Sequence, residues 1–135
     1  MKFKTEPYAH QLEAFERFKD KPYFALFMDM GTGKTKTMID LSAYKYETQQ
    51  INAVLILAPN HVHAQWINQE YPKHCPIPYE PFLWKSSKAA SSVWCKLLDV
   101  FITEPKGRMK VLAVNIEAFQ STTVIPFIAK YVKVY

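Results

Sequence analysis

The stretch YFALFMDMGTGKT, residues 23–35, joins a continuous apolar run to a glycine-containing turn. An apolar run without alternation is typical of a strand that is buried on both faces of a parallel sheet. The residues after the turn carry apolar side chains at helical spacing. We therefore expect a strand over residues 23–28, a tight turn, and a helix over residues 34–45.

The turn has the composition of a phosphate-binding loop. Its two glycines let the backbone N–H groups point inward, and the helix after it offers further N–H groups and the positive end of its dipole. Lys34 is long enough to reach the β- and γ-phosphates, and the Thr35 hydroxyl suits Mg²⁺. The sequence therefore predicts ATP and Mg²⁺ as cofactors, with Lys34 and Thr35 as catalytic residues and Thr35 as the metal ligand. The expected nucleotide contacts of the loop are Met30, Gly31, Thr32, Gly33, Lys34, Thr35 and Lys36.

The match to the usual motif, G-x-x-x-x-G-K-[ST], is partial. Met28 stands at the first glycine position, whereas the Gly33-Lys34-Thr35 core is intact. A chance glycine-rich turn is the alternative interpretation. The expected strand before the loop and helix after it favour phosphate binding.

Apolar runs and helical periodicities alternate along the rest of the chain. The expected helices cover residues 10–19, 61–71 and 87–102, and short helices or turns cover 117–120 and 123–129. The expected strands cover residues 53–58, 80–85, 110–114 and 131–135. Strands separated by helices indicate an α/β fold, a parallel sheet with helices on both faces. The turns after its strands should meet at one edge of the sheet, where such folds bind ligands.

Length, composition and charge fit one soluble domain. The chain has 135 residues, of which 49% are hydrophobic and 21% charged. The net charge of +5 suits contact with nucleic acid, although an ordinary basic domain can carry the same charge. Cys75 and Cys95 are isolated, and neither a signal peptide nor a membrane-spanning stretch is visible. We therefore expect a cytoplasmic protein without membrane contact.

One segment ahead of the phosphate loop resembles a motif of the superfamily-two helicases. The segment Pro7-Tyr8-Ala9-His10-Gln11 is similar to the Pro-Tyr-x-x-Gln segment that precedes the phosphate loop in that family. The resemblance implies that Gln11 contacts the adenine edge, for which an amide offers both a donor and an acceptor. A solvated glutamine at a helix N-terminus is the alternative for this segment taken alone.

Two later segments resemble motifs of the Snf-type helicases and translocases within that superfamily. Residues 55–66, LILAPNHVHAQW, are similar to motif Ia, and residues 111–119, VLAVNIEAF, are similar to motif Ib with isoleucine in place of an aromatic. The resemblance implies that nucleic acid, DNA rather than RNA, contacts Asn60, His61 and Asn115. Capping of the next turn is the alternative role for Asn115.

The four segments together resemble the first motor domain of a helicase, in the form found in phages and bacteria. The resemblance covers nearly the whole chain and implies that residues 1–135 are the N-terminal portion of a RecA-like ATP-binding domain. In that family a strand ending in an acidic pair holds Mg²⁺ and polarises water, and a second RecA-like domain supplies arginines. The sequence shows neither, so we expect these residues alone to bind ATP without hydrolysing it well.

Two other functions share parts of this pattern. A small P-loop kinase would also need a basic lid and a carboxylate for its acceptor, and the sequence shows neither. A nucleotide-responsive nucleic-acid-binding module without catalysis stays open as an alternative. The spacing of His61, His63, His74 and Cys75 does not match a zinc-binding pattern, so a metal site at these residues is not expected.

Overall fold

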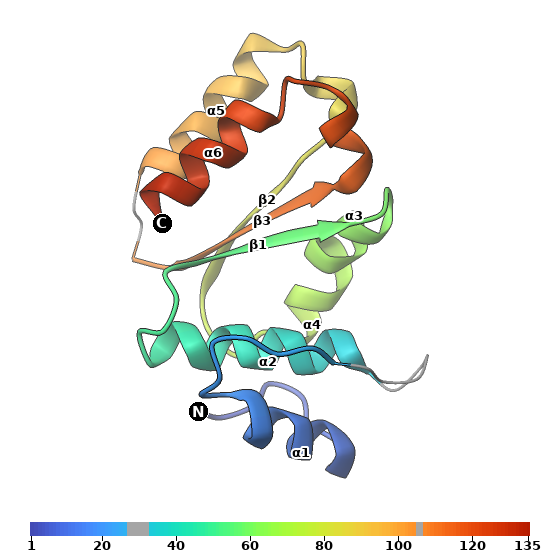
Figure 1. Ribbon diagram of the computed structural model, residues 1–135, viewed down its shortest axis with the longest axis vertical. Coiled ribbons are helices and arrows are strands. Elements are labelled where there is room, and N and C mark those ends of the chain that lie inside the picture. Colours follow the sequence, from blue (N-terminus) through green and yellow to red (C-terminus); the bar gives the residue numbers. More distant parts are fainter. Residues whose placement is uncertain (27–32, 105–106) are drawn as a thin grey trace.

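A computed structural model describes residues 1–26, 33–104 and 107–135 of the chain. A parallel sheet lies at its centre, and helices cover both faces of the sheet (Figure 1). The strands are β1 (Ala53–Ala58), β2 (Tyr79–Leu83) and β3 (Met109–Asn115), in the order β1-β3-β2. The expected α/β class, with a parallel sheet between helices, is confirmed.

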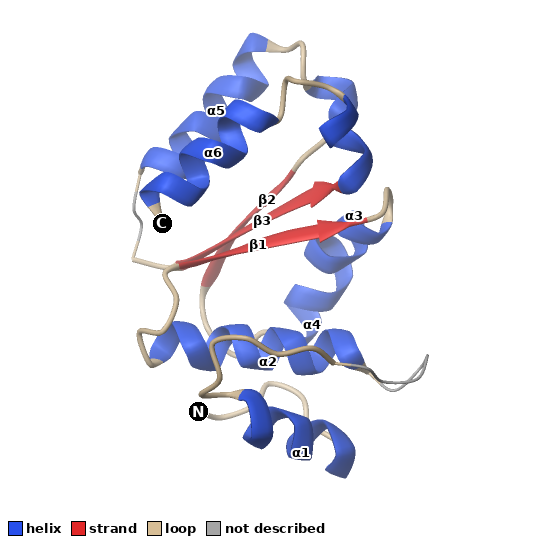
Figure 2. Cartoon of the chain, in the orientation of Figure 1, coloured by secondary structure: helices blue, strands red, loops and turns tan. Residues whose placement is uncertain are grey.

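Helices form a layer on each side of the sheet (Figure 2). On one side lie α2 (Lys34–Glu47) and a helical stretch made of α3 (Val62–Gln65), a π-helical turn (Trp66–Glu70) and α4 (Tyr71–His74). We call this stretch the 62–74 helix. On the other side lie α5 (Ser92–Thr103) and α6 (Ile125–Val134), while α1 (Ala9–Phe18) packs against α2. Short 3₁₀ helices cover Ser86–Lys88 and Ile116–Gln120. Among the residues described, no helix combines the length and the apolar character that a bilayer crossing requires.

β3 is the central strand, and all seven of its residues are buried. Val111 and Ala113 belong to the hydrophobic cluster under α2 and the 62–74 helix. Leu112 and Val114 belong to the cluster under α5 and α6. Because successive side chains of a strand point to opposite faces, one continuous apolar run supplies both cores.

The expected strand over residues 23–28 is wrong for the part that the structure describes. Residues 23–26 form no strand, and residues 27–28 lie outside the described residues. Phe24 stacks on Phe18 of α1, with their ring centroids 5.0 Å apart, and the Lys45 ammonium of α2 lies over its ring. Tyr23 is 91% exposed. This apolar run therefore begins by packing on α1 and α2 rather than between strands.

The expected strand over residues 131–135 is also wrong, because α6 extends through most of it. The sequence YVKVY alternates with a period of two, but Val124, Tyr131 and Tyr135 also fit a helical period. Tyr131 of this helix and Val124 just before it are buried, and the Tyr131 O–H donates to the Val54 carbonyl oxygen at 2.8 Å. Packing against the sheet therefore decides in favour of the helix.

The helix expected over residues 61–71 continues to His74, although Pro72 was expected to end it. The N–H of Tyr71 bonds to the carbonyl of Trp66, five residues back, at the end of the π-helical turn. Pro72 therefore stands in the first turn of a new α-helical segment, where its missing N–H costs little. This extension matters, because the end of the helix lines a cavity at the beginning of α2.

Candidate functional site

A cavity of about 510 Å³ lies where the N-terminal segment, the beginning of α2 and the end of the 62–74 helix meet. We call it the α2 cavity, and its volume is within the roughly 300–1,000 Å³ of typical small-molecule sites. It brings together five of the predicted nucleotide contacts: Gln11, Gly33, Lys34, Thr35 and Lys36. Met30, Gly31 and Thr32 lie outside the described residues, so their predicted contacts stay predictions.

A neighbouring cavity shares Lys34 with the α2 cavity. Its described lining is otherwise mostly apolar and includes Phe24, Leu26 and Met38. Anionic phosphates need N–H and ammonium donors, which the α2 cavity offers in Gly33, Lys34 and Thr35. The α2 cavity is therefore the better candidate for a phosphate site.

Gly33 is the N-cap of α2 and has a left-handed backbone, with φ 80° and ψ 36°. A side chain at this position is strained by the positive φ, and a Cβ would overlap the Gln11 Nε2 atom. Gly33 provides no side-chain cap for α2, and the backbone N–H groups in the first turn of a helix are the groups that anions bind. Helix α2 therefore begins as an anion site requires.

Gln11 is buried and links the N-terminal segment to Gly33. Its Oε1 atom accepts from the Tyr8 backbone N–H at 2.8 Å, and its Nε2 atom donates to the Gly33 carbonyl oxygen at 3.3 Å. Both ends of the amide are thus used by the protein in this structure. The predicted contact with adenine stays a prediction.

Lys36 lines the α2 cavity, but its ammonium bonds to a neighbour on the same helix. The Lys36 Nζ atom lies 2.6 Å from Asp40 Oδ2, and both residues are buried. Burial raises the pKa of the Asp40 carboxyl, while the ammonium of Lys36 partly opposes this rise. The ion pair stabilises the charged carboxylate inside α2, and the predicted nucleotide contact of Lys36 stays a prediction.

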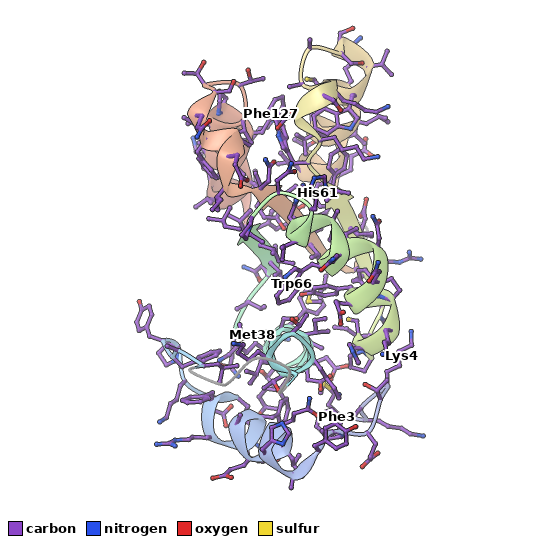
Figure 3. All side chains as sticks on the ribbon, turned by 90° about the vertical axis from the view of Figure 1, so that its right-hand side faces the viewer. Phe3, Lys4, Met38, His61, Trp66 and Phe127 are labelled. Atoms are coloured by element: carbon purple, nitrogen blue, oxygen red, sulfur yellow. The ribbon has the colours of Figure 1, made fainter. Side chains whose placement is uncertain are left out.

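The wall opposite α2 is formed by the end of the 62–74 helix, and the sequence motifs did not indicate it. Thr5 Oγ1 hydrogen-bonds to His74 Nδ1 at 2.7 Å, and His74 Nε2 lies 3.4 Å from a Glu70 carboxylate oxygen. The Lys4 ammonium donates to the Pro72 carbonyl oxygen at 2.6 Å, and Lys4 lies by the end of this helix in Figure 3. Burial lowers the pKa of His74, which favours the neutral imidazole. In the sequence, the only indication of this wall is the spacing of Glu70 and His74, which places them one helical turn apart.

A second cavity, of about 400 Å³, lies at the carboxyl ends of the strands. We call it the strand-end cavity. The three predicted nucleic-acid residues, Asn60, His61 and Asn115, all line it. They meet there because Ala58 at the end of β1 pairs with Asn115 at the end of β3. Lys85 and Ser86, which follow β2, complete this side of the cavity.

Glu117 connects the turns after β1 and β3. Its carboxylate accepts the Asn60 backbone N–H at 3.0 and 3.3 Å, and the Asn115 Nδ2 group lies 3.4 Å from it. Its own backbone N–H, and then the N–H donors of Asn60 and Asn115, lower the pKa of Glu117. The Asn60 backbone N–H is thus bonded to Glu117, and Asn60 is an exposed residue of the cavity lining. The side chain of Asn115 makes no capping bond to the next turn.

The aromatic and histidine side chains behind the strand-end cavity are structural. Trp84 is 2% exposed and belongs to the cluster under α5 and α6. The buried His63 places its Nε2 atom 3.0 Å from the Trp84 carbonyl oxygen. Trp66 is partly buried and packs against the other cluster. Within the described ranges, no group of three or more His, Cys, Asp or Glu side chains is arranged to hold a metal ion.

Residues 4–123 match the model of a protein family described as "Type III restriction enzyme, res subunit". Comparison with curated proteins and with solved structures gave no match. The matched range contains both cavities and every residue predicted from the sequence to bind nucleotide or nucleic acid.

Proposed function

We infer that this chain, which belongs to the type III restriction enzyme res subunit family, is the ATP-binding part of a DNA helicase or translocase motor. The family is of superfamily-two helicase type, with a RecA-like P-loop fold. Helicase-type domains of this fold use ATP and Mg²⁺ and bind nucleic acid. The choice of DNA, and of a Snf-type motor, is our proposal and rests on residues 55–66 and 111–119.

The observation that supports ATP binding most is the convergence at the beginning of α2. Gln11, Gly33, Lys34 and Thr35 come from two separate segments and line one cavity. Gly33 takes the left-handed conformation that a tight phosphate loop uses before its helix. We propose that the phosphates lie against Gly33–Thr35, with Lys34 as counter-ion and Thr35 as a ligand of Mg²⁺.

Titration of the chain with ATP by isothermal calorimetry tests this proposal. We expect one ATP per chain, and tighter binding with Mg²⁺ than with EDTA, because Thr35 binds the ion that bridges the phosphates. Adenosine, which lacks phosphates, should bind far more weakly. Equal affinities for ATP and adenosine, or no heat from ATP at millimolar concentration, would contradict a phosphate site.

We propose that single-stranded DNA crosses the strand-end cavity and contacts it through the sugar-phosphate backbone. The described lining offers amide, hydroxyl and ammonium groups, such as Asn60, Ser86 and Lys85. These groups donate to phosphate oxygens without identifying the base. The buried Trp84 presents little ring surface for stacking, which argues against base recognition at this cavity.

The substitution Asn60→Asp should weaken binding of single-stranded DNA by about fivefold or more at low salt, because it places a negative charge near a phosphate. Asn52→Asp is the matched control. Asn52 lies just before β1 and Asn60 lies after it, and both residues are exposed. The two variants have the same net charge. Fluorescence anisotropy with a labelled oligonucleotide measures both affinities. An equal loss of DNA affinity in the two variants would contradict DNA binding at the strand-end cavity.

Hydrolysis separates the motor from the alternative of a binding module without catalysis. We propose that these residues alone hydrolyse ATP slowly, because no acidic pair follows an apolar strand in the sequence. A steady-state ATPase assay with and without single-stranded DNA measures this. DNA-stimulated turnover by residues 1–135 alone would contradict this part of the proposal.

A further inference from the structure

The α2 cavity has a second wall that no sequence motif of the chain indicated. One wall is the beginning of α2, with Gly33, Lys34 and Thr35. The other is the end of the 62–74 helix, with Glu70, Lys73 and His74. A ligand that fills the cavity therefore touches two elements that are separate in the sequence.

Contacts from the N-terminal segment hold this second wall in place. Lys4 bonds to the Pro72 carbonyl oxygen, and Thr5 bonds to His74, which also faces the Glu70 carboxylate. The side chain of His74 has 12% relative exposure, so this link is largely shielded from solvent. These bonds tie the second wall to the N-terminal segment. A side chain on this wall can therefore bind a ligand in the cavity.

Lys73 is the cation that this wall presents. It is exposed in the last turn of α4, lines the cavity, and makes no hydrogen bond or ion pair with any residue in the described ranges. Lys36, across the cavity, differs because its ammonium is held by Asp40.

We propose that Lys73 binds the phosphates of the nucleotide from the side opposite Lys34, so that the triphosphate lies between two lysines. This proposal rests on the proposed ATP site. An ammonium on each side of an anionic chain is favoured by Coulomb attraction. The bonds of Lys4 to Pro72 and of Thr5 to His74 hold the two residues that flank Lys73 against the N-terminal segment. The 62–74 helix also lines the strand-end cavity through His63 and Asn68, so one helix borders both proposed sites.

Charge reversal at Lys73 tests the proposal, with Lys133→Glu as the matched control. Lys133 is also exposed and also lies in the last turn of a helix, α6, so both variants change the same charge at the same kind of helix position. We expect Lys73→Glu to weaken Mg-ATP binding in the full 135-residue chain by about tenfold, and Lys133→Glu by less than about twofold. The neutral variant Lys73→Gln should fall between the wild type and Lys73→Glu. Thermal melting of each variant verifies that it is folded.

Inorganic tripolyphosphate shows which part of the nucleotide Lys73 contacts. A contact with phosphates predicts that Lys73→Glu weakens tripolyphosphate and ATP by the same factor. Loss of ATP affinity without loss of tripolyphosphate affinity overturns the proposal, as do equal affinities in Lys73→Glu and Lys133→Glu. If Lys34→Ala abolishes ATP binding while Lys73→Glu does not change it, the second-wall contact fails and the ATP site stands. If the wild type binds neither ATP nor tripolyphosphate, the ATP site and the Lys73 contact are both wrong.

Discussion

Replacing Lys34 with alanine should lower the affinity for Mg-ATP by about 100-fold or more. An ammonium that bridges two phosphates makes charge-assisted hydrogen bonds, each worth roughly 1.5–3 kcal/mol. Lys36 is not expected to take its place, because the Lys36 ammonium is held by Asp40 at 2.6 Å, and Lys73 is proposed to act from the other wall of the cavity. Isothermal calorimetry on the wild type and Lys34→Ala measures the difference.

The control for Lys34→Ala is Lys96→Ala, which removes an exposed lysine of α5 that lines neither cavity. Both variants lower the net charge by one, so a general loss of attraction for anions would affect them equally. We expect Lys96→Ala to bind ATP as the wild type does. An affinity of Lys34→Ala within about threefold of the wild type would show that Lys34 does not meet the phosphates.

Replacing Gly33 with alanine should both destabilise the chain and remove ATP binding. An alanine at φ 80° is strained by roughly 1–2 kcal/mol, and its Cβ would displace the Gln11 amide. The bond from Gln11 to the Gly33 carbonyl would break as Gln11 moves. We therefore expect the free energy of unfolding to fall by about 2 kcal/mol or more, as measured by urea denaturation.

A double-mutant cycle separates the two causes of this loss. In the Gln11→Ala background the overlap with the amide is gone, so Gly33→Ala should cost only the backbone strain of roughly 1–2 kcal/mol. The two substitutions should therefore be less destabilising together than the sum of their separate effects. Strict additivity would mean that Gln11 and Gly33 do not contact each other in solution.

The sequence predicted strands well where a continuous apolar run could be buried in only one way, inside the sheet. The strand over residues 53–58 has the predicted bounds, and β3 exceeds its prediction by one residue at each end. Both runs are bounded by turn residues, and burial in a parallel sheet is the main way to cover them. The runs at 23–26 and 131–135 were assigned wrongly because α1, α2 and the other face of the sheet offer them apolar surfaces, which local periodicity does not reveal.

The candidate site could be predicted to the extent that it follows from topology. Asn60 and Asn115 were expected to meet because parallel strands bring their carboxyl ends to one edge, and the structure places them in one cavity. The second wall of the α2 cavity was not predictable in this way. It depends on a hydrogen bond between Thr5 and His74, 69 residues apart, and on a helix that continues past Pro72. Glu117 lies within the segment that resembles motif Ib, but its bond to the Asn60 backbone N–H could not be read from the sequence.

The most direct test of the ATP site is a crystal structure of the chain with Mg²⁺ and a non-hydrolysable ATP analogue. We predict that the β- and γ-phosphates lie in the α2 cavity, with the Gly33–Thr35 N–H groups and the Lys34 ammonium within hydrogen-bonding distance. Lys73 should approach the same phosphates from the opposite wall. An analogue bound elsewhere on the chain, with the α2 cavity unoccupied at saturating concentration, would contradict the account.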